Sequence, residues 1–165
     1  MKIEFDVKFA AKDLYLFNMY QAYRGLQGIV SIVLPILIFA YTAYNWNNVE
    51  LETSILNIGI GVVFFTYVPV SLWLRSAKTV KTNEVLSKPL HYEFSEDAIR
   101  VSQEEESAEF QWENIYRMIT LGDMVLIYTN RINAYIIPKK QIVEEYAALK
   151  ELAKSKLEKY RIKMK

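Results

Sequence analysis

Few residues of this 165-residue chain have side chains that could do covalent or metal chemistry. There is no cysteine, which excludes disulfides, zinc–thiolate sites and cysteine nucleophiles. His91 is the only histidine, and no serine and acid stand in a catalytic pattern with it, so a structural or surface role is favoured. The sequence also lacks a phosphate-cradling glycine loop and a hydrolase nucleophile elbow. We therefore predict that the chain is not an enzyme and has no catalytic residue, cofactor or metal.

One acidic run has a composition that could suggest a cation site. It consists of Glu104-Glu105-Glu106 and the nearby Glu109. A calcium site needs ligands arranged around a turn, with help from glycine or backbone carbonyls. Three adjacent glutamates point in different directions instead. The run therefore predicts a solvated hairpin turn.

Basic residues gather after the second apolar run, at Lys139-Lys140, and near the C-terminus. Each basic side chain close to an anionic membrane surface contributes about 1 kcal/mol of binding. The lysine pair also fits a solvated helix entrance, and the C-terminal residues also fit a frayed, solvated tail. The predicted lipid-headgroup contacts are Arg75, Lys78, Lys81, Lys139, Lys140, Lys159, Arg161 and Lys163.

Two long stretches carry no charge, and only Glu50-Leu51-Glu52 separates them. They are residues 25–49 and 53–74. A 20-residue helix spans about 30 Å, the thickness of the hydrocarbon core of a bilayer. We therefore predict a transmembrane helical hairpin. A cleaved signal peptide and a buried hairpin in a soluble core are the alternatives, but 24 residues precede the first stretch and Ser31 is its one strongly polar side chain between Ile29 and Tyr41.

The hairpin divides the chain into three expected parts. Residues 1–24 form an N-terminal strand and an entry helix, residues 25–74 the hairpin, and residues 75–165 a small soluble domain. The formal net charge is +1, so no global field attracts nucleic acid, and no nucleic-acid partner is expected.

The positions of lysine and arginine predict the orientation of the two spans. Basic residues close to a span prefer the cytoplasmic side. None stands between the spans, so we expect a multi-pass protein of the inner membrane with both termini in the cytoplasm. The flanking basic residues are Lys2, Lys8, Lys12 and Arg24 before the first span, and Arg75, Lys78, Lys81 and Lys88 after the second.

The N-terminal residues change period from two to helical. Between Lys2 and Phe9, apolar residues alternate with charged ones, which predicts a half-buried strand. A lone strand is unstable, so it must join a sheet beyond the hairpin. From Asp13 the apolar spacing becomes helical. This entry helix fits a membrane-surface anchor and packing on the soluble domain equally well.

The sequence between Leu90 and Pro138 predicts short strands separated by turns. This pattern favours an antiparallel sheet, sandwich or barrel. From Pro138 to the end of the chain we predict one amphipathic helix that docks on the sheet. The expected class is α+β, with the hairpin inserted in a small antiparallel β domain. The apolar stripe of the helix is Ile142, Tyr146, Leu149, Ala153 and Tyr160.

This arrangement resembles the YcxB-like family of small bacterial membrane proteins. The residues that carry the resemblance are 91–99, with the sequence HYEFSEDAI, then 110–115 with FQWENI, and 135–140 with YIIPKK. The resemblance implies a pleckstrin-homology-like (PH-like) soluble domain, a curved sheet capped by a C-terminal helix. It implies no catalytic residue.

We therefore expect a non-catalytic binding or regulatory module that the hairpin holds at the inner leaflet. Its partners would be the bilayer and a protein, a peptide or lipid headgroups, and self-association stays open. An immunity protein that protects its producer against a toxin is the alternative, on analogy alone. The spans hold no ionisable residue, which disfavours a transporter.

Overall fold

Alternating apolar and charged residues at the N-terminus build the first strand. The computed structural model describes residues 2–164, apart from the side chain of Gln27, and its strand β1 (Ile3–Val7) alternates between buried and exposed residues. β1 pairs antiparallel with β2 (Leu90–Phe94), in a register that places Val7 opposite Leu90. The first strand therefore lies in the sheet formed by residues that follow the apolar helices.

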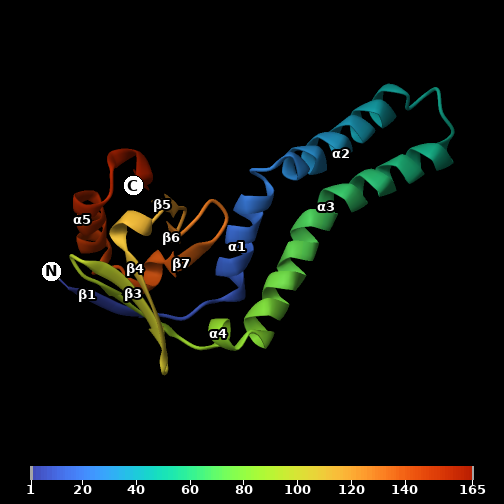
Figure 1. Cartoon of the computed structure of the whole chain (residues 1–165). Helices are drawn as coiled ribbons and strands as arrows, with labels where there is room; N and C mark the ends of the chain where they lie inside the picture. Colours follow the sequence, from blue (N-terminus) through green and yellow to red (C-terminus); the bar gives the residue numbers. More distant parts are fainter. Residues whose placement is uncertain (1, 165) are drawn as a thin grey trace. The chain divides into compact units, whose positions relative to one another are not determined.

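The first sheet continues with β3 (Ala98–Gln103) and β4 (Glu106–Gln111), in the antiparallel order β1-β2-β3-β4 (Figure 1). The β3–β4 turn falls at Glu104 and Glu105, as the acidic run predicts, and Glu104 adopts a φ of 53°. The short helix α4 (Glu84–Ser87) precedes the sheet, and the Asn83 side chain caps it.

The second sheet has the order β7-β6-β5-β8. β5 (Arg117–Leu121), β6 (Met124–Tyr128) and β7 (Ala134–Pro138) form an antiparallel meander, and the turn between β5 and β6 contains Gly122 at a φ of +54°. All residues of β6 are buried, which requires cover on both faces of this sheet. The last strand, β8 (Ile162–Lys163), pairs parallel with β5.

Aromatic rings connect the two sheets. The ring of Tyr92 on β2 meets the ring of Tyr135 on β7 edge-on, with 6.2 Å between centroids. Trp112, in the 3-10 turn η1 (Trp112–Asn114), donates from Nε1 to the carbonyl of Ser95 over 3.0 Å. The main core of the unit therefore lies between the sheets, and Trp112 closes one edge of it.

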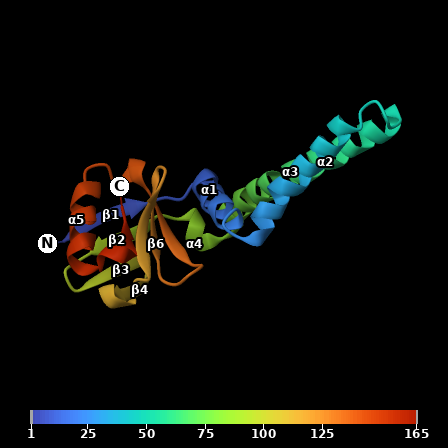
Figure 2. The same cartoon turned by 90° about the horizontal axis from the view of Figure 1, so that it is seen from above.

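The C-terminal helix α5 (Tyr146–Lys156) lies beside the strands in both views (Figure 1 and Figure 2). It buries Leu149, Leu152 and Ala153, and the hydroxyls of Tyr146 and Thr120 of β5 lie 2.9 Å apart. The sequence predicts one helix from Pro138 to the end of the chain. This prediction is wrong at both ends of the helix, because α5 begins at Tyr146 and ends at Lys156. A 3-10 turn, η2 (Lys139–Gln141), precedes α5.

After Lys156 the chain turns away from the helical path. Leu157 is extended, η3 (Lys159–Arg161) is a 3-10 turn, and β8 follows. Tyr160 is therefore not part of the helical stripe and is 71% exposed. The physical reason is that Leu157 and Met164 are buried and β8 gains a ladder with β5, which together outweigh the helical pattern. The alternative of a frayed tail is equally wrong for residues 157–164.

Three helices form the rest of the chain. α1 (Ala11–Ala22) begins with Asp13 accepting a hydrogen bond from the amide of Ala10, and is followed by α2 (Leu26–Tyr44) and α3 (Leu51–Thr82). Contacts divide the chain into two compact units, Met1–Leu14 with Thr79–Lys165, and Tyr15–Lys78. The helical unit thus extends past the expected boundaries at residues 24 and 74.

Within the helical unit, α2 and α3 lie side by side and run in opposite directions (Figure 2). α3 is long and apolar enough to cross a membrane, with a mean hydropathy of 1.9 over its most apolar window, of which 6% is buried. α2 is apolar but shorter. α1 meets α3 through the amide of Asn18, which donates to the Ser76 hydroxyl over 3.1 Å.

Gly61 lets α2 and α3 approach each other, and Gly59 offers a matched control. A Cβ on Gly61 would overlap the ring of Phe39, lying 2.8 Å from its Cζ, whereas nothing lies within 4 Å of a Cβ on Gly59. We expect Gly61→Leu to destabilise the helical unit by about 1–3 kcal/mol through overpacking. Gly59→Leu should be neutral or stabilising. Thermal unfolding in detergent measures both, and equal effects would contradict close packing at Gly61.

The hydroxyl of Tyr92 is buried and has no hydrogen-bond partner within the described residues. Burial raises the pKa of this phenol, and Tyr135 adds to the shift, so it stays neutral. Tyr92→Phe keeps the ring contacts and removes the unsatisfied atom, so we expect the free energy of unfolding to stay equal or rise by up to about 1 kcal/mol. Tyr92→Ala should lose about 3–5 kcal/mol. Denaturant titration distinguishes them, and a clearly destabilised Tyr92→Phe would reveal a buried partner such as water.

Candidate functional site

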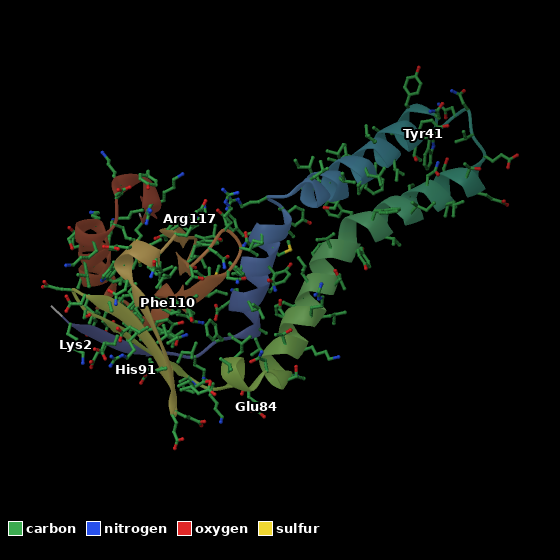
Figure 3. The ribbon with its side chains drawn as sticks, in the orientation of Figure 1. Lys2, Tyr41, Glu84, His91, Phe110 and Arg117 are labelled. Atoms are coloured by element: carbon green, nitrogen blue, oxygen red, sulfur yellow. The ribbon has the colours of Figure 1, made fainter. Side chains whose placement is uncertain are left out.

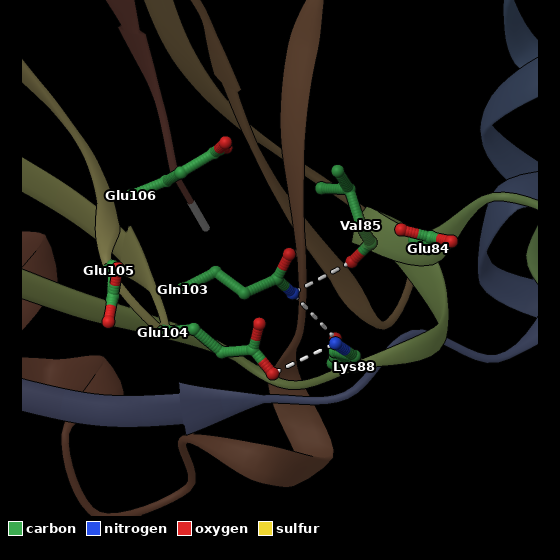
Figure 4. A pocket seen from close by; sticks show the side chains of 7 residues that line it. All are labelled: Glu84, Val85, Lys88, Gln103, Glu104, Glu105 and Glu106. Atoms are coloured by element: carbon green, nitrogen blue, oxygen red, sulfur yellow. Dashed lines mark hydrogen bonds and ion pairs between the residues drawn. The ribbon is translucent and has the colours of Figure 1, made fainter.

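An acidic cleft and a basic cleft open on the β unit. The acidic cleft has a volume of about 490 Å³ and lies between α4 and the β3–β4 turn (Figure 4). Its carboxylates outnumber its one lysine. The lining residues are Glu84, Val85, Lys88, Gln103, Glu104, Glu105 and Glu106.

Internal bonds already use the polar groups at the floor of the acidic cleft. The Gln103 amide nitrogen lies within hydrogen-bond distance of the carbonyls of Val85, Lys88 and Pro89, at 2.9, 3.2 and 3.1 Å. Lys88 Nζ lies 2.8 Å from Glu104 Oε1. No group of acidic or histidine side chains within the described residues could hold a metal ion. The acidic cleft therefore has a structural explanation, namely fastening residues 84–89 to β3.

The second cleft is basic and aromatic. It has a volume of about 250 Å³ and is formed by β5, η3 and β8, with Tyr116 just before β5. We call it the basic cleft, and it is lined by Tyr116, Arg117, Ile119, Tyr160, Arg161 and Lys163. Its lining contains cations, phenols and one apolar side chain, and no carboxylate.

Arg161 is held in place by the backbone. Its Nη1 donates to the carbonyls of Glu113 and Ile115, over 3.0 and 3.3 Å, and its Nε donates to the Tyr160 hydroxyl over 3.3 Å. That bond to Tyr160 raises the pKa of the Arg161 guanidinium, and the negative charge of Glu158 makes a smaller contribution in the same direction. Arg161 is therefore a fixed cation rather than a mobile surface side chain.

Arg117 is positioned by aromatic rings. Its guanidinium carbon lies 4.3 Å from the ring centroid of Tyr128 and 5.7 Å from that of Tyr116 (Figure 3 labels Arg117). Such stacking holds the planar group and keeps its edge free to donate. Its Nε is buried, yet it has no hydrogen-bond partner within residues 2–164. The Nε donor of Arg117 is therefore unsatisfied within the described residues.

Lys163 is brought to the cleft by strand pairing. It lies in β8, opposite Ile119 of β5 in the parallel register. Its side chain is exposed. None of the three cleft cations takes part in an ion pair within the described part of the chain, whereas the partnered surface cations include Lys2, Lys88, Arg100 and Lys154.

The structure separates the residues predicted to contact lipid headgroups. Arg75 and Lys78 lie in the helical unit, and Lys81 is exposed near the end of α3. Lys139 packs over the ring of Tyr146, with Nζ 4.4 Å from the centroid, and Lys140 and Lys159 are exposed outside the cleft. Of the predicted set, the basic cleft contains Arg161 and Lys163.

Sequence reasoning missed Arg117, Tyr116 and Tyr160 as members of one site. A single arginine in a strand between apolar residues carries little signal. The pairing of β8 with β5 brings these residues together, and it links positions more than 40 residues apart in a register that no local pattern encodes. The prediction of a structural or surface role for His91 agrees with the structure, since its Nδ1 lies 2.7 Å from Asp6 Oδ1 across the exposed face of β1 and β2.

Residues 94–153 match the family model described as YcxB-like protein. The match confirms the resemblance seen in the sequence, over less than half of the chain and within the β unit. No curated protein and no solved structure gave a significant match.

We expect Arg161→Lys to loosen the C-terminal segment, because one ammonium nitrogen cannot replace both Nη1, which bonds to the two carbonyls, and Nε, which bonds to the Tyr160 hydroxyl. Losing about 1–1.5 kcal/mol of hydrogen bonding should raise the local opening of β8 about tenfold. Hydrogen exchange of a peptide covering residues 158–164 measures this. Lys159→Gln, in the same turn but without these bonds, is the control, and equal exchange in both variants would contradict the anchoring role.

Proposed function

We propose that this chain, whose residues 94–153 match the YcxB-like family, is an integral membrane protein of the inner membrane that presents its β unit in the cytoplasm as a non-catalytic binding module. The observation that carries the proposal is the polarity of the helical unit. Most large apolar side chains of α2 and α3 are exposed, and the buried residues of these helices are small. A helix pair that folds in water has the opposite pattern, with its large apolar side chains buried and polar side chains on the surface.

The inverted polarity is clear on α3. Its buried residues are Ser54, Gly61 and Ser76, while Phe65 is 54% exposed and Val63 is 63% exposed. Soluble monomers rarely expose apolar patches larger than a few hundred Å². In a bilayer the large side chains face lipid and small residues let helices approach closely. The burial pattern therefore favours a lipid environment for the helical unit.

The sheet register supports an even number of crossings. Val7 and Leu90 are partners in the β1–β2 ladder, so the segment between them begins and ends within the same sheet. A segment that leaves and returns to one aqueous side must cross the bilayer an even number of times. Since α3 is long enough to cross once, α2 is the natural return, and its 19 residues span about 28 Å.

The order of elements in the β unit supports a PH-like module. A four-stranded antiparallel sheet is followed by a three-stranded meander and then by a helix, and the family resemblance implies a sheet capped by a C-terminal helix. β8 is an addition to that layout. The immunity role stays a prediction from sequence, because no described feature favours it.

The absence of native cysteine makes the topology directly testable. Asn47→Cys, in the loop between α2 and α3, should react with a membrane-impermeant maleimide in intact bacterial cells. Glu105→Cys, in the β3–β4 turn, should react only after permeabilisation. Both proteins should remain in the membrane after alkaline carbonate extraction. Release of the chain by carbonate, or labelling of Glu105→Cys in intact cells, would overturn the proposal.

A further inference from the structure

We propose that the basic cleft is a binding site for a phosphate group. The ligand class is a phosphate ester, supplied either by the headgroup of an anionic phospholipid or by a small soluble phosphate compound. This deepens the proposed function and rests on it for the placement of the site in the cytoplasm. The cleft is formed by residues of the β unit alone.

The first argument is charge. Arg117, Arg161 and Lys163 line one cleft of about 250 Å³ without a lining carboxylate. Like charges held this close repel one another, and a bound anion converts the repulsion into attraction. Elsewhere on the same unit the cations Lys88 and Arg100 are neutralised by acidic neighbours. What distinguishes the basic cleft is that it gathers three cations within one lining.

The second argument is geometry. A guanidinium presents paired donors that match two oxygens of a phosphate group. Arg161 uses Nη1 and Nε in internal bonds, which fixes its plane, and its Nη2 makes no hydrogen bond within the described residues. The rings of Tyr128 and Tyr116 hold the guanidinium of Arg117, whose buried Nε is unsatisfied within the described residues. Both arginines are thus oriented in advance, which lowers the entropy lost on binding.

The third argument is size and lining. A volume of about 250 Å³ lies below the range of about 300–1,000 Å³ that is usual for drug-sized ligands. It suits a phosphate group with a small substituent. The phenols of Tyr116 and Tyr160, 43% and 71% exposed, flank the cations and offer further hydroxyl donors.

The test uses the full-length protein in nanodiscs of phosphatidylcholine, with radiolabelled inorganic phosphate and equilibrium dialysis. We expect saturable binding by the wild type. Arg117→Gln should weaken binding about tenfold to hundredfold, because it removes a charge-assisted donor. Lys163→Gln should also weaken it, and this exposed side chain has no internal bond, so its loss leaves the fold intact. Lys140→Gln, exposed and outside the cleft, is the matched control and should bind like the wild type.

Discs that contain phosphatidylglycerol separate the two sources of phosphate. If the protein's own bilayer supplies the ligand, these discs should lower the affinity for soluble phosphate more than discs in which oleate supplies equal negative charge. Equal affinity in the two kinds of anionic disc assigns the cleft to a soluble phosphate compound. Absence of binding in phosphatidylcholine discs, or equal losses in Lys163→Gln and Lys140→Gln, would overturn the phosphate site. Neither result bears on topology, which carbonate extraction and cysteine labelling decide.

Discussion

The ladder between β1 and β2 is the constraint on which the rest of the structure depends. It joins residues 3–7 to residues 90–94, so the apolar helices are an insertion within one sheet. Without β1, β2 would become an edge strand, and the rings of Tyr92 and Phe94 would lose their stacking partner Phe5, whose centroid lies 5.7 and 5.5 Å from theirs. β1 can pair with β2 only after the whole insertion between them has been synthesised. The β1–β2 ladder is therefore a non-local contact that forms late.

The segment beyond β1 is also fastened to the distant half of the β unit. The Gln141 side chain accepts from the amide of Lys8 and donates to its carbonyl, each over 2.9 Å, as a neighbouring strand would. Phe9, just beyond, is buried. The chain is thus held by the β unit up to the start of α1. Both ends of the insertion belong to one folded body, because Thr79–Lys165 forms a single unit with the first residues.

In the helical unit the size of a side chain determines whether it is buried between the helices, whereas in the β unit its polarity does. Pro35 and Thr42 are buried on α2, and Ser54 and Gly61 are buried on α3, each pair seven residues apart. A seven-residue repeat is the period of helices that pack side by side at a small angle. Thr42 satisfies its hydroxyl internally by donating to the carbonyl of Ile38 over 2.8 Å. Close packing between the helices therefore uses these small residues together with the ring of Phe39, and many of the other large apolar residues remain exposed to the surroundings.

The sequence predicts those features of the fold that local pattern determines. The alternation of apolar and charged residues predicts β1, and turn residues predict the β3–β4 and β5–β6 connections. The two uncharged stretches predict α2 and α3. Prediction failed where pairing across the chain competes with a local pattern. The apolar spacing continues from Leu149 to Tyr160, but the helix ends at Lys156 because the tail gains more from strand pairing and burial.

The same departure from helical structure creates the basic cleft. Along a continued helix, Arg161 and Lys163 would be two residues apart and would point to different sides. The 3-10 turn and β8 instead carry both residues to β5, where Arg117 already lies between aromatic rings. Because β8 has only two residues, its ladder alone is weak, and the bonds from Arg161 to the carbonyls of Glu113 and Ile115 must supply much of the attachment. One of the cations of the cleft thus helps to hold the cleft together, so binding and the order of the C-terminal segment are coupled.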